Sequence, residues 1–154
     1  MKIRYIVLFI FTFSVFLMSC STRESQLKSE SSPLVGTWQL VSGTLIEKGD
    51  TTVTYYTKEL SFIKIINDSH FAFLMHNVDK SDSAFAYGSG GGKYELRDST
   101  YTEHLEYCTD RQWEGHDFTF TVTIKGDTLV QRGIEKIESA GVDRLNIEKY
   151  FRLK

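Results

Sequence analysis

Hydrophobic and polar residues alternate with a period of two along much of this chain. The clearest case is the segment 117–125, where Phe118, Phe120, Val122 and Ile124 are separated by threonines. Successive side chains of a strand point to opposite faces, so this pattern predicts a strand with one buried and one solvated face. No part of the sequence after residue 34 shows a sustained helical repeat of apolar residues. The pattern therefore indicates an all-β domain.

Short turn sequences separate the predicted strands. Lys125-Gly126-Asp127-Thr128 leads from 117–125 into a strand at 129–135, and Asn67-Asp68-Ser69 separates strands at 60–66 and 70–77. Both arrangements are typical of hairpins. Further strands are predicted at 36–46, 84–87, 93–96, 101–108 and 145–153, with a shorter piece at 52–56 and a loop, with room for one helical turn, at 136–143.

About eight short antiparallel strands in chain order close most readily into an up-and-down barrel, because closure removes the exposed edges of an open sheet. We therefore expect a single barrel over residues 34–154. The glycine-rich segment 81–92 has two interpretations, a mouth loop over a ligand or a strongly bent strand at a barrel corner, and the second is favoured. Trp113, in a polar loop, is either a contact residue or a plug packed over one barrel end.

The first twenty residues follow a different pattern. Lys2 and Arg4 precede an apolar run at 5–18, which ends in Leu17-Met18-Ser19-Cys20. This order predicts a lipoprotein signal peptide over 1–19, with Cys20 as the lipidated first residue of the mature protein. The run is shorter than the roughly 20 residues of a spanning helix. An ordinary cleaved signal, or an N-terminal anchor that happens to end in cysteine, is the alternative.

The composition and charge of the sequence indicate where the protein is located. Residues 20–33 are rich in serine and charged side chains and predict a flexible tether that ends at Pro33, the only proline. The chain has 18 basic and 20 acidic residues; since Lys2 and Arg4 lie in the signal peptide, the mature protein has a formal charge of −4. The sequence contains no cluster of basic residues of the kind that would indicate nucleic-acid binding. We expect acyl chains, such as palmitate, on Cys20 to attach the protein to the membrane. We therefore expect the protein to be located in the cell envelope, attached to the outer membrane more readily than to the inner one. Its folded domain is expected to lie in the periplasm or on the cell surface.

The ends of the domain resemble a known family. Leu34-Val35-Gly36-Thr37-Trp38-Gln39-Leu40 is similar to the opening strand of lipocalin-like barrels of the calycin type, and Glu148-Lys149-Tyr150-Phe151-Arg152-Leu153 to their closing strand. The chain stops after that strand, so it resembles the compact lipoprotein domains of unknown function in Gram-negative bacteria, which lack the classical C-terminal helix. The resemblance implies that Trp38 plugs one barrel end and that Arg152 stacks on it, a structural pair worth roughly 0.5–2 kcal/mol.

Polar residues on two strands are candidates for ligand binding. Alternation places Tyr101, Glu103 and Tyr107 on one face of their strand, and it places Glu148, Tyr150 and Arg152 on one face of the last strand. If both faces point inward, the lumen can orient an amphipathic ligand; otherwise the apolar residues of the last strand fill it. The inward polar face is favoured, because the resemblance places Arg152 near Trp38. The candidate ligand-binding residues are Tyr94, Tyr101, Glu103, Tyr107 and Tyr150.

Catalysis, cofactors and metals are not expected. Glu103 and His104 are adjacent on a strand and so face opposite sides. The four histidines, His70, His76, His104 and His116, are too scattered to chelate one ion. With Cys20 lipidated, Cys108 has no cysteine partner, and we expect it to be a small buried hydrophobe. An envelope enzyme using Glu103 is the least favoured function.

The sequence thus predicts a lipid-anchored envelope barrel that binds a small hydrophobic or amphipathic molecule without turnover. The alternative is an interaction or inhibitor module, whose barrel is filled by its own side chains and whose loops bind an envelope protein.

Overall fold

The computed structural model of the protein describes residues 32–79, 81 and 87–154. The predicted signal peptide, Cys20 and the tether as far as residue 31 lie outside the described residues, as does most of the predicted strand 84–87. The described chain is all-β, without α-helix. None of its residues forms a helix long and apolar enough to span a membrane.

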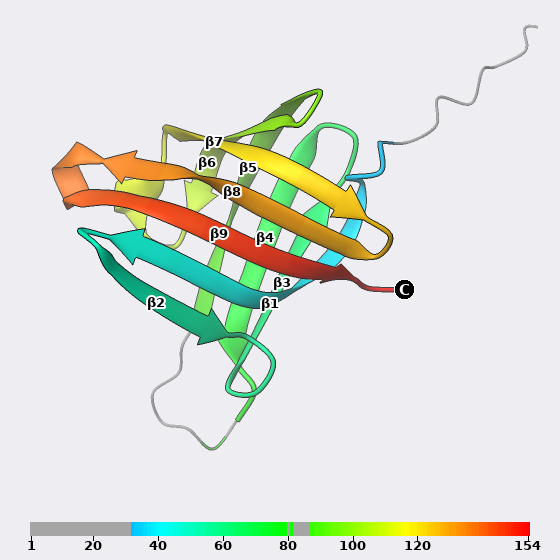
Figure 1. The fold of residues 1–154 in the computed structure, drawn as a ribbon, viewed down its shortest axis with the longest axis horizontal. Coiled ribbons are helices and arrows are strands. Elements are labelled where there is room, and N and C mark those ends of the chain that lie inside the picture. The colour runs from blue at the N-terminus through cyan, green and yellow to red at the C-terminus, as the bar shows by residue number, and fades with distance from the viewer. Residues whose placement is uncertain (1–31, 80, 82–86) are drawn as a thin grey trace, which may run out of the picture.

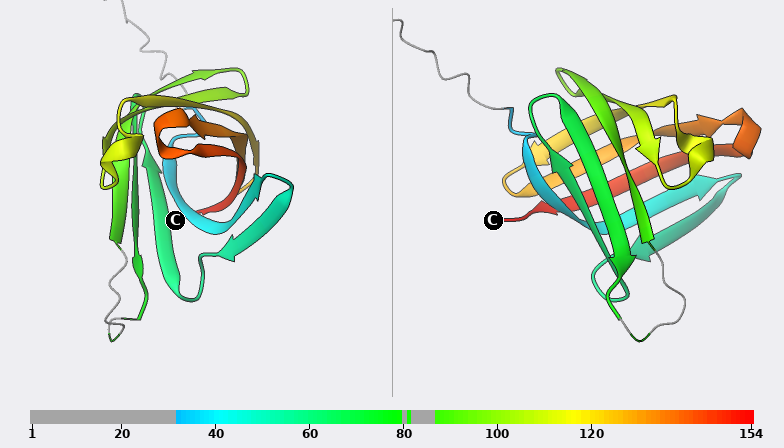
Figure 2. Two further views of the ribbon diagram at one scale, coloured as in Figure 1. Left: turned by 90° about the vertical axis from the view of Figure 1, so that its left-hand side faces the viewer. Right: turned by 180° about the vertical axis from the view of Figure 1, so that it is seen from behind.

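The described residues form nine antiparallel strands in one sheet that closes on itself (Figures 1 and 2). The strands are β1 (Gly36–Glu47), β2 (Asp50–Tyr55), β3 (Leu60–Ile66), β4 (His70–Asn77), β5 (Tyr87–Arg97), β6 (Thr100–Cys108), β7 (His116–Lys125), β8 (Thr128–Ile137) and β9 (Val142–Arg152). Pairing of β1 with β9 makes a closed barrel of eight strands, β1 and β3 to β9. The predicted fold class is therefore confirmed.

Strand β2 is the additional, ninth strand. The first part of β1, Gly36–Gln39, pairs with β3, and the second part, Ser42–Glu47, pairs with β2. Both partners therefore use the same edge of β1, and the β1–β2 hairpin extends the wall beyond the end of β3 (Figure 2). The chain returns to the barrel at Tyr56, whose backbone N–H donates to the Val41 carbonyl at 3.0 Å.

Two of the predicted boundaries are wrong. The segment 136–143, expected to be a loop, mostly extends the strands: β8 continues to Ile137, β9 begins at Val142, and one 3₁₀ turn, Glu138–Ala140, joins them. Strand β5 begins at Tyr87, earlier than the strand predicted at 93–96. The glycines at 88–92 lie within it, with a register shift between Gly91 and Gly92, which agrees with the favoured bent strand and not with a mouth loop. A Cβ at Gly92 would overlap the His104 carbonyl of β6, so the neighbouring backbone requires glycine there.

The core fills the barrel end at which β1 begins and continues along the walls of the rest of the barrel. Its apolar side chains, no more than 5% exposed, come from most strands, as the alternation predicts: Leu34, Trp38, Leu40, Ile66, Phe71, Tyr101, Leu105, Phe118, Phe120, Leu129, Ile137 and Tyr150. On β7, Phe118, Phe120 and Val122 are buried while the threonines between them are exposed.

Trp38 and Arg152 close this end together. They are direct neighbours across β1 and β9, and the Arg152 guanidinium carbon lies 4.0 Å from the centre of the Trp38 ring. The guanidinium also donates to the carbonyls of Val35 at 2.8 Å and Pro33 at 2.5 Å. A Cβ at Gly36, which has φ of +150°, would overlap this group, and this explains the glycine two residues before the tryptophan.

Replacement of Arg152 tests this closure. Arg152→Ala removes the cation–π contact and two charge-assisted hydrogen bonds, and we expect it to lower the free energy of unfolding by about 2–4 kcal/mol. Arg132→Ala, on the exposed face of β8, is the matched control and is expected to change it by less than about 0.5 kcal/mol. Urea unfolding at pH 7 measures both. Equal effects of the two changes would contradict the role assigned to Arg152.

Candidate functional site

A cavity of about 270 Å³ occupies the half of the barrel away from Trp38. Its walls are mainly aromatic and aliphatic, and they come from β1, β3, β4, β6 and β7 and from the loop after β6: Leu45, Phe62, Phe73, Leu105, Trp113, Phe118 and Phe120. Asp110, which is exposed, lies at its rim. The barrel is therefore packed at one end and hollow at the other.

A group of buried polar side chains, the polar floor, lies within this hollow half. It consists of Lys64, Glu103, Gln131 and Glu148, which all line the cavity. Lys64 is 3% exposed. Its Nζ lies 2.7 Å from Glu103 Oε1, 3.2 Å from Gln131 Oε1 and 3.9 Å from Glu148 Oε2. One cation thus faces two carboxylates.

Burial and mutual attraction oppose each other in the polar floor. Burial by itself lowers the pKa of Lys64, but the carboxylates of Glu103 and Glu148 outweigh this and raise it above its ordinary value. Burial raises the pKa of Glu103; Lys64 acts in the opposite direction, and Glu148 adds to the rise. Lys64 therefore stays charged, while Glu103 is easier to protonate than an exposed glutamate.

Two buried tyrosines lie beside these carboxylates. The Tyr150 hydroxyl donates to Glu148 Oε2 at 2.6 Å. Burial and then the charge of Glu148 raise the pKa of Tyr150, so it remains a neutral donor. Burial and the nearby Glu103 likewise raise the pKa of Tyr101. The Tyr101 hydroxyl makes no well-aligned hydrogen bond with the described residues.

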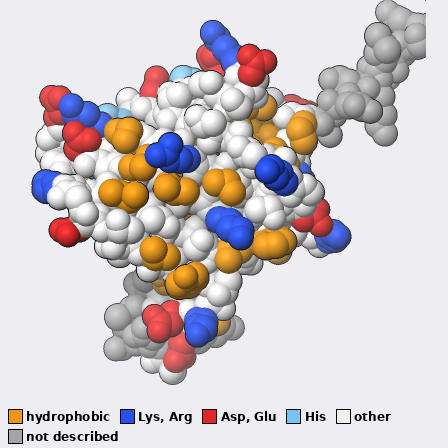
Figure 3. All heavy atoms as spheres, viewed as in Figure 1, with side chains coloured by type: hydrophobic (Ala, Val, Ile, Leu, Met, Phe, Trp, Pro, Cys, Tyr) orange, Lys and Arg blue, Asp and Glu red, His pale blue; other side chains and the backbone are white. Residues whose placement is uncertain are grey.

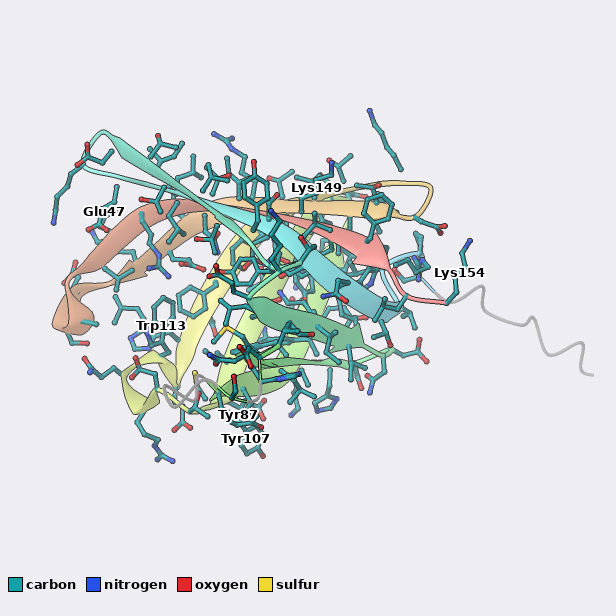
Figure 4. The ribbon with its side chains drawn as sticks, turned by 90° about the horizontal axis from the view of Figure 1, so that it is seen from below. Glu47, Tyr87, Tyr107, Trp113, Lys149 and Lys154 are labelled. Carbon is teal, nitrogen blue, oxygen red and sulfur yellow. The ribbon has the colours of Figure 1, made fainter. Side chains whose placement is uncertain are left out.

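A second ion pair lies nearer the rim. Glu135 accepts from Arg144 Nε and from Asn146 Nδ2, each at 2.7 Å. The Arg144 guanidinium carbon is 5.1 Å from the centre of the Trp113 ring, which in turn packs against Phe118. Trp113 therefore packs over the barrel end, which is one of the two interpretations of its sequence (Figure 4).

Aromatic rings form one continuous side of the cavity. Phe62 and Phe73 stack with centroids 5.5 Å apart, and Tyr56 meets Phe62 edge-on at 5.9 Å. The glycines opposite leave the space that these rings fill: Tyr56 packs on Gly43, and Phe73 lies where a Cβ of Gly90 would be. The site thus combines an apolar wall with a polar floor, which is typical of ligand pockets.

The predicted ligand-binding residues are distributed unevenly. Glu103 lines the cavity, and Tyr101 and Tyr150 are buried beside it, so the polar face of the last strand points inward as favoured. Tyr94 is not part of the lining: its ring packs on Tyr101, 5.3 Å between centroids, and its hydroxyl donates to the Asn67 carbonyl at 2.7 Å.

The prediction that Tyr107 faces the barrel lumen is wrong. Its side chain lies outside the barrel and is 68% exposed (Figure 4). A bulge shifts the register of β5 and β6 between Gly91, opposite Tyr107, and Gly92, opposite Leu105. The extra residue, Glu106, reverses the facing of the residues after it. Tyr107 turns outward, and Cys108 turns inward to line the cavity.

Several lining residues were missed by the sequence analysis. Lys64, Gln131, Glu135, Arg144 and Asn146 all occupy inward positions of their strands. The sequence does contain a sign of the inward position of Lys64. This lysine interrupts the apolar run of 60–66 and lies on the same face of the strand as Phe62 and Ile66. The histidines show no such convergence: His104 faces outward and contacts Asp117 at 2.7 Å, and the described residues hold no group of three metal-ligating side chains.

The fold and the cavity define a small, closed antiparallel β-barrel with an internal polar-floored pocket. A family described as a domain of unknown function, DUF4488, matches residues 33–154, so the chain belongs to this family. No match is found among curated proteins.

The polar floor makes a stability prediction. Lys64→Met leaves Glu103 buried without its cation and is expected to cost about 3–5 kcal/mol at pH 7. Adding Glu103→Gln removes the stranded charge, so the double variant should be more stable than the single one. A carboxyl whose pKa is raised in the folded state loses stability as pH rises. Urea unfolding of Lys64→Met, measured at pH values from 5 to 8, should therefore show stability falling as the pH rises.

The double variant lacks the Glu103 carboxyl, and its stability should depend less on pH over the same range. If the single and double variants were equally stable at pH 7, Lys64 would not be neutralising a buried charge.

Proposed function

We propose that this protein is a lipid-anchored, lipocalin-like barrel of the bacterial cell envelope that binds a small amphipathic molecule and does not transform it. The observation that carries the proposal is the cavity of about 270 Å³, with its aromatic wall and its polar floor. A hollow barrel favours a ligand carrier over a module filled by its own side chains.

The size of the cavity limits the ligand. Pockets for drug-sized molecules span roughly 300–1,000 Å³, and this cavity lies just below that range. It suits a molecule with one small ring or a short chain. The polar floor would hold one end of the ligand and the rings of Tyr56, Phe62 and Phe73 the other.

Binding is favoured over catalysis by the state of the reactive groups. Glu103 lines the cavity and its pKa is raised, as an acid–base group requires, but its carboxylate is held by Lys64 at 2.7 Å. Cys108 also lines the cavity. Burial raises the pKa of its thiol, and this disfavours the thiolate that a nucleophile needs.

The anchor is supported by the leader pattern of the sequence. Lys2, Arg4 and the apolar run before Cys20 predict lipidation. The described chain begins beside the Trp38–Arg152 end, where Val35 N–H donates to the Ser32 carbonyl at 2.9 Å. A tether there would hold the barrel by its packed end, with the cavity rim pointing away from the membrane.

Native mass spectrometry tests the carrier. The chain from Ser21 onward, exported and purified without detergent, keeps every strand of the barrel and is expected to retain a bound small molecule. Leu45→Trp places an indole in the cavity and should abolish the added mass. Tyr107→Ala, on the outside, is the control and should retain it. A wild-type chain without added mass, or a Leu45→Trp variant that keeps it, would refute the proposal.

Cys20→Ala tests the anchor. We expect the wild-type protein to incorporate labelled palmitate and to fractionate with the outer membrane, with an intact mass that begins at an acylated Cys20. The variant should incorporate no label. Palmitate incorporation by Cys20→Ala would show that Cys20 is not the acylated residue, and a soluble wild-type protein would show that the anchor is absent.

An interaction module remains a second candidate because of the outer face of β8 and β9. Ile134 and Phe151 are exposed there, and Arg132 and Lys149 lie among them. Figure 3 shows hydrophobic and basic side chains intermingled on this face. An envelope protein that binds this face would copurify with the wild-type chain and be lost from an Ile134→Ser variant.

A further inference from the structure

We propose that the cavity is selective for a small organic cation, an amine, whose ammonium group binds Glu148 and whose hydrocarbon part lies on the Tyr56–Phe62–Phe73 wall. This inference rests on the proposed function, because it names the ligand class of the same cavity.

The charges that line the cavity favour a cation. Two basic side chains, Lys64 and Arg144, face four acidic ones: Glu103, Glu135, Glu148 and Asp110. Inside a barrel, charges are screened less than at a surface, so an anionic ligand would be repelled and a cation attracted.

The pairing pattern identifies Glu148 as the acceptor. Lys64 is taken by Glu103 at 2.7 Å and Arg144 by Glu135 at 2.7 Å. Glu148 has only the long 3.9 Å approach of Lys64 and the hydrogen bond from Tyr150, both at Oε2. Its Oε1 accepts no hydrogen bond from the described residues. The side chain is 17% exposed and lines the cavity, so a ligand can reach it.

The aromatic wall suits the same ligand. Burial and then the charge of Glu148 raise the pKa of Tyr56, which places this ring within the field of that carboxylate. An ammonium between the two would meet a carboxylate on one side and a ring face on the other, as in other ammonium sites. Arg144 over Trp113 already shows one cation on an aromatic ring at the rim.

The acidic floor predicts a pH dependence. Glu103 faces Lys64 from β3, Tyr101 on its own strand, and Glu148 and Tyr150 from β9. Burial raises the pKa of Glu103, so acidification protonates it and leaves less negative charge in the cavity. Affinity for a cation should therefore fall as pH falls, and cation binding should release protons.

Titration calorimetry with three probes of similar shape tests the selectivity: 2-phenylethylamine, 2-phenylethanol and 3-phenylpropionate. The chain from Ser21 onward is expected to bind the amine about tenfold or more tightly than the alcohol, as one charge-assisted contact predicts. The carboxylate should bind most weakly. Preference for the alcohol or the carboxylate would overturn the inference and leave the carrier proposal standing. Failure of all three to bind, in a protein without a bound mass, would overturn both.

Glu148→Gln localises the effect. The amide keeps the size of the side chain and an acceptor for Tyr150, and it should lose about tenfold in amine affinity with the alcohol affinity unchanged. Glu106→Gln, exposed on the outside of β6, is the matched control. Wild-type protein gives a separate readout that needs no variant. Because the pKa of Glu103 is raised, amine affinity should fall as the pH is lowered from 7 to 5, and binding should release protons, measured in buffers of different ionisation enthalpy. An amine affinity insensitive to both changes would refute the inference.

Discussion

The buried charge of Lys64 is the constraint on which the interior of this barrel depends. An ammonium that is 3% exposed must be neutralised within the protein, because burying it alone would cost far more than the fold could supply. Glu103, Gln131 and Glu148 come from three other strands to do so. Their convergence divides the lumen into an apolar packed end and a hollow end with a polar floor.

The packed end has its own requirement, which is closure between the first and last strands. Trp38 and Arg152 are cross-strand neighbours, and Gly36 leaves room for the guanidinium. Arg152 also binds the carbonyls of Pro33 and Val35, so the residues that precede β1 belong to the barrel end. This end carries the structural role, and the other end is free to hold a ligand.

Alternation predicted the strands well because it reflects which face of each strand is buried, a local property of the chain. It failed where pairing with a neighbouring strand introduces a bulge or lengthens the strand. The bulge opposite Gly91 and Gly92 reversed Tyr107 and Cys108, and nothing in residues 101–108 alone signals it. Likewise, 136–143 resembles a loop in composition, but pairing of β8 with β9 continues to Ile137 and Val142.

The sequence by itself determined an all-β barrel and its hairpins, because these follow from period-two patterning and turn chemistry. The Gly36–Trp38–Arg152 signature and the inward polar face on the last strand were expected from the resemblance of the terminal strands to a known family of barrels. Only the tertiary structure decided which polar residues meet. Lys64 and Glu103 are 39 positions apart, and Lys64 and Gln131 are 67 apart. Such contacts depend on strand order and register around a closed barrel, and a local pattern does not specify either.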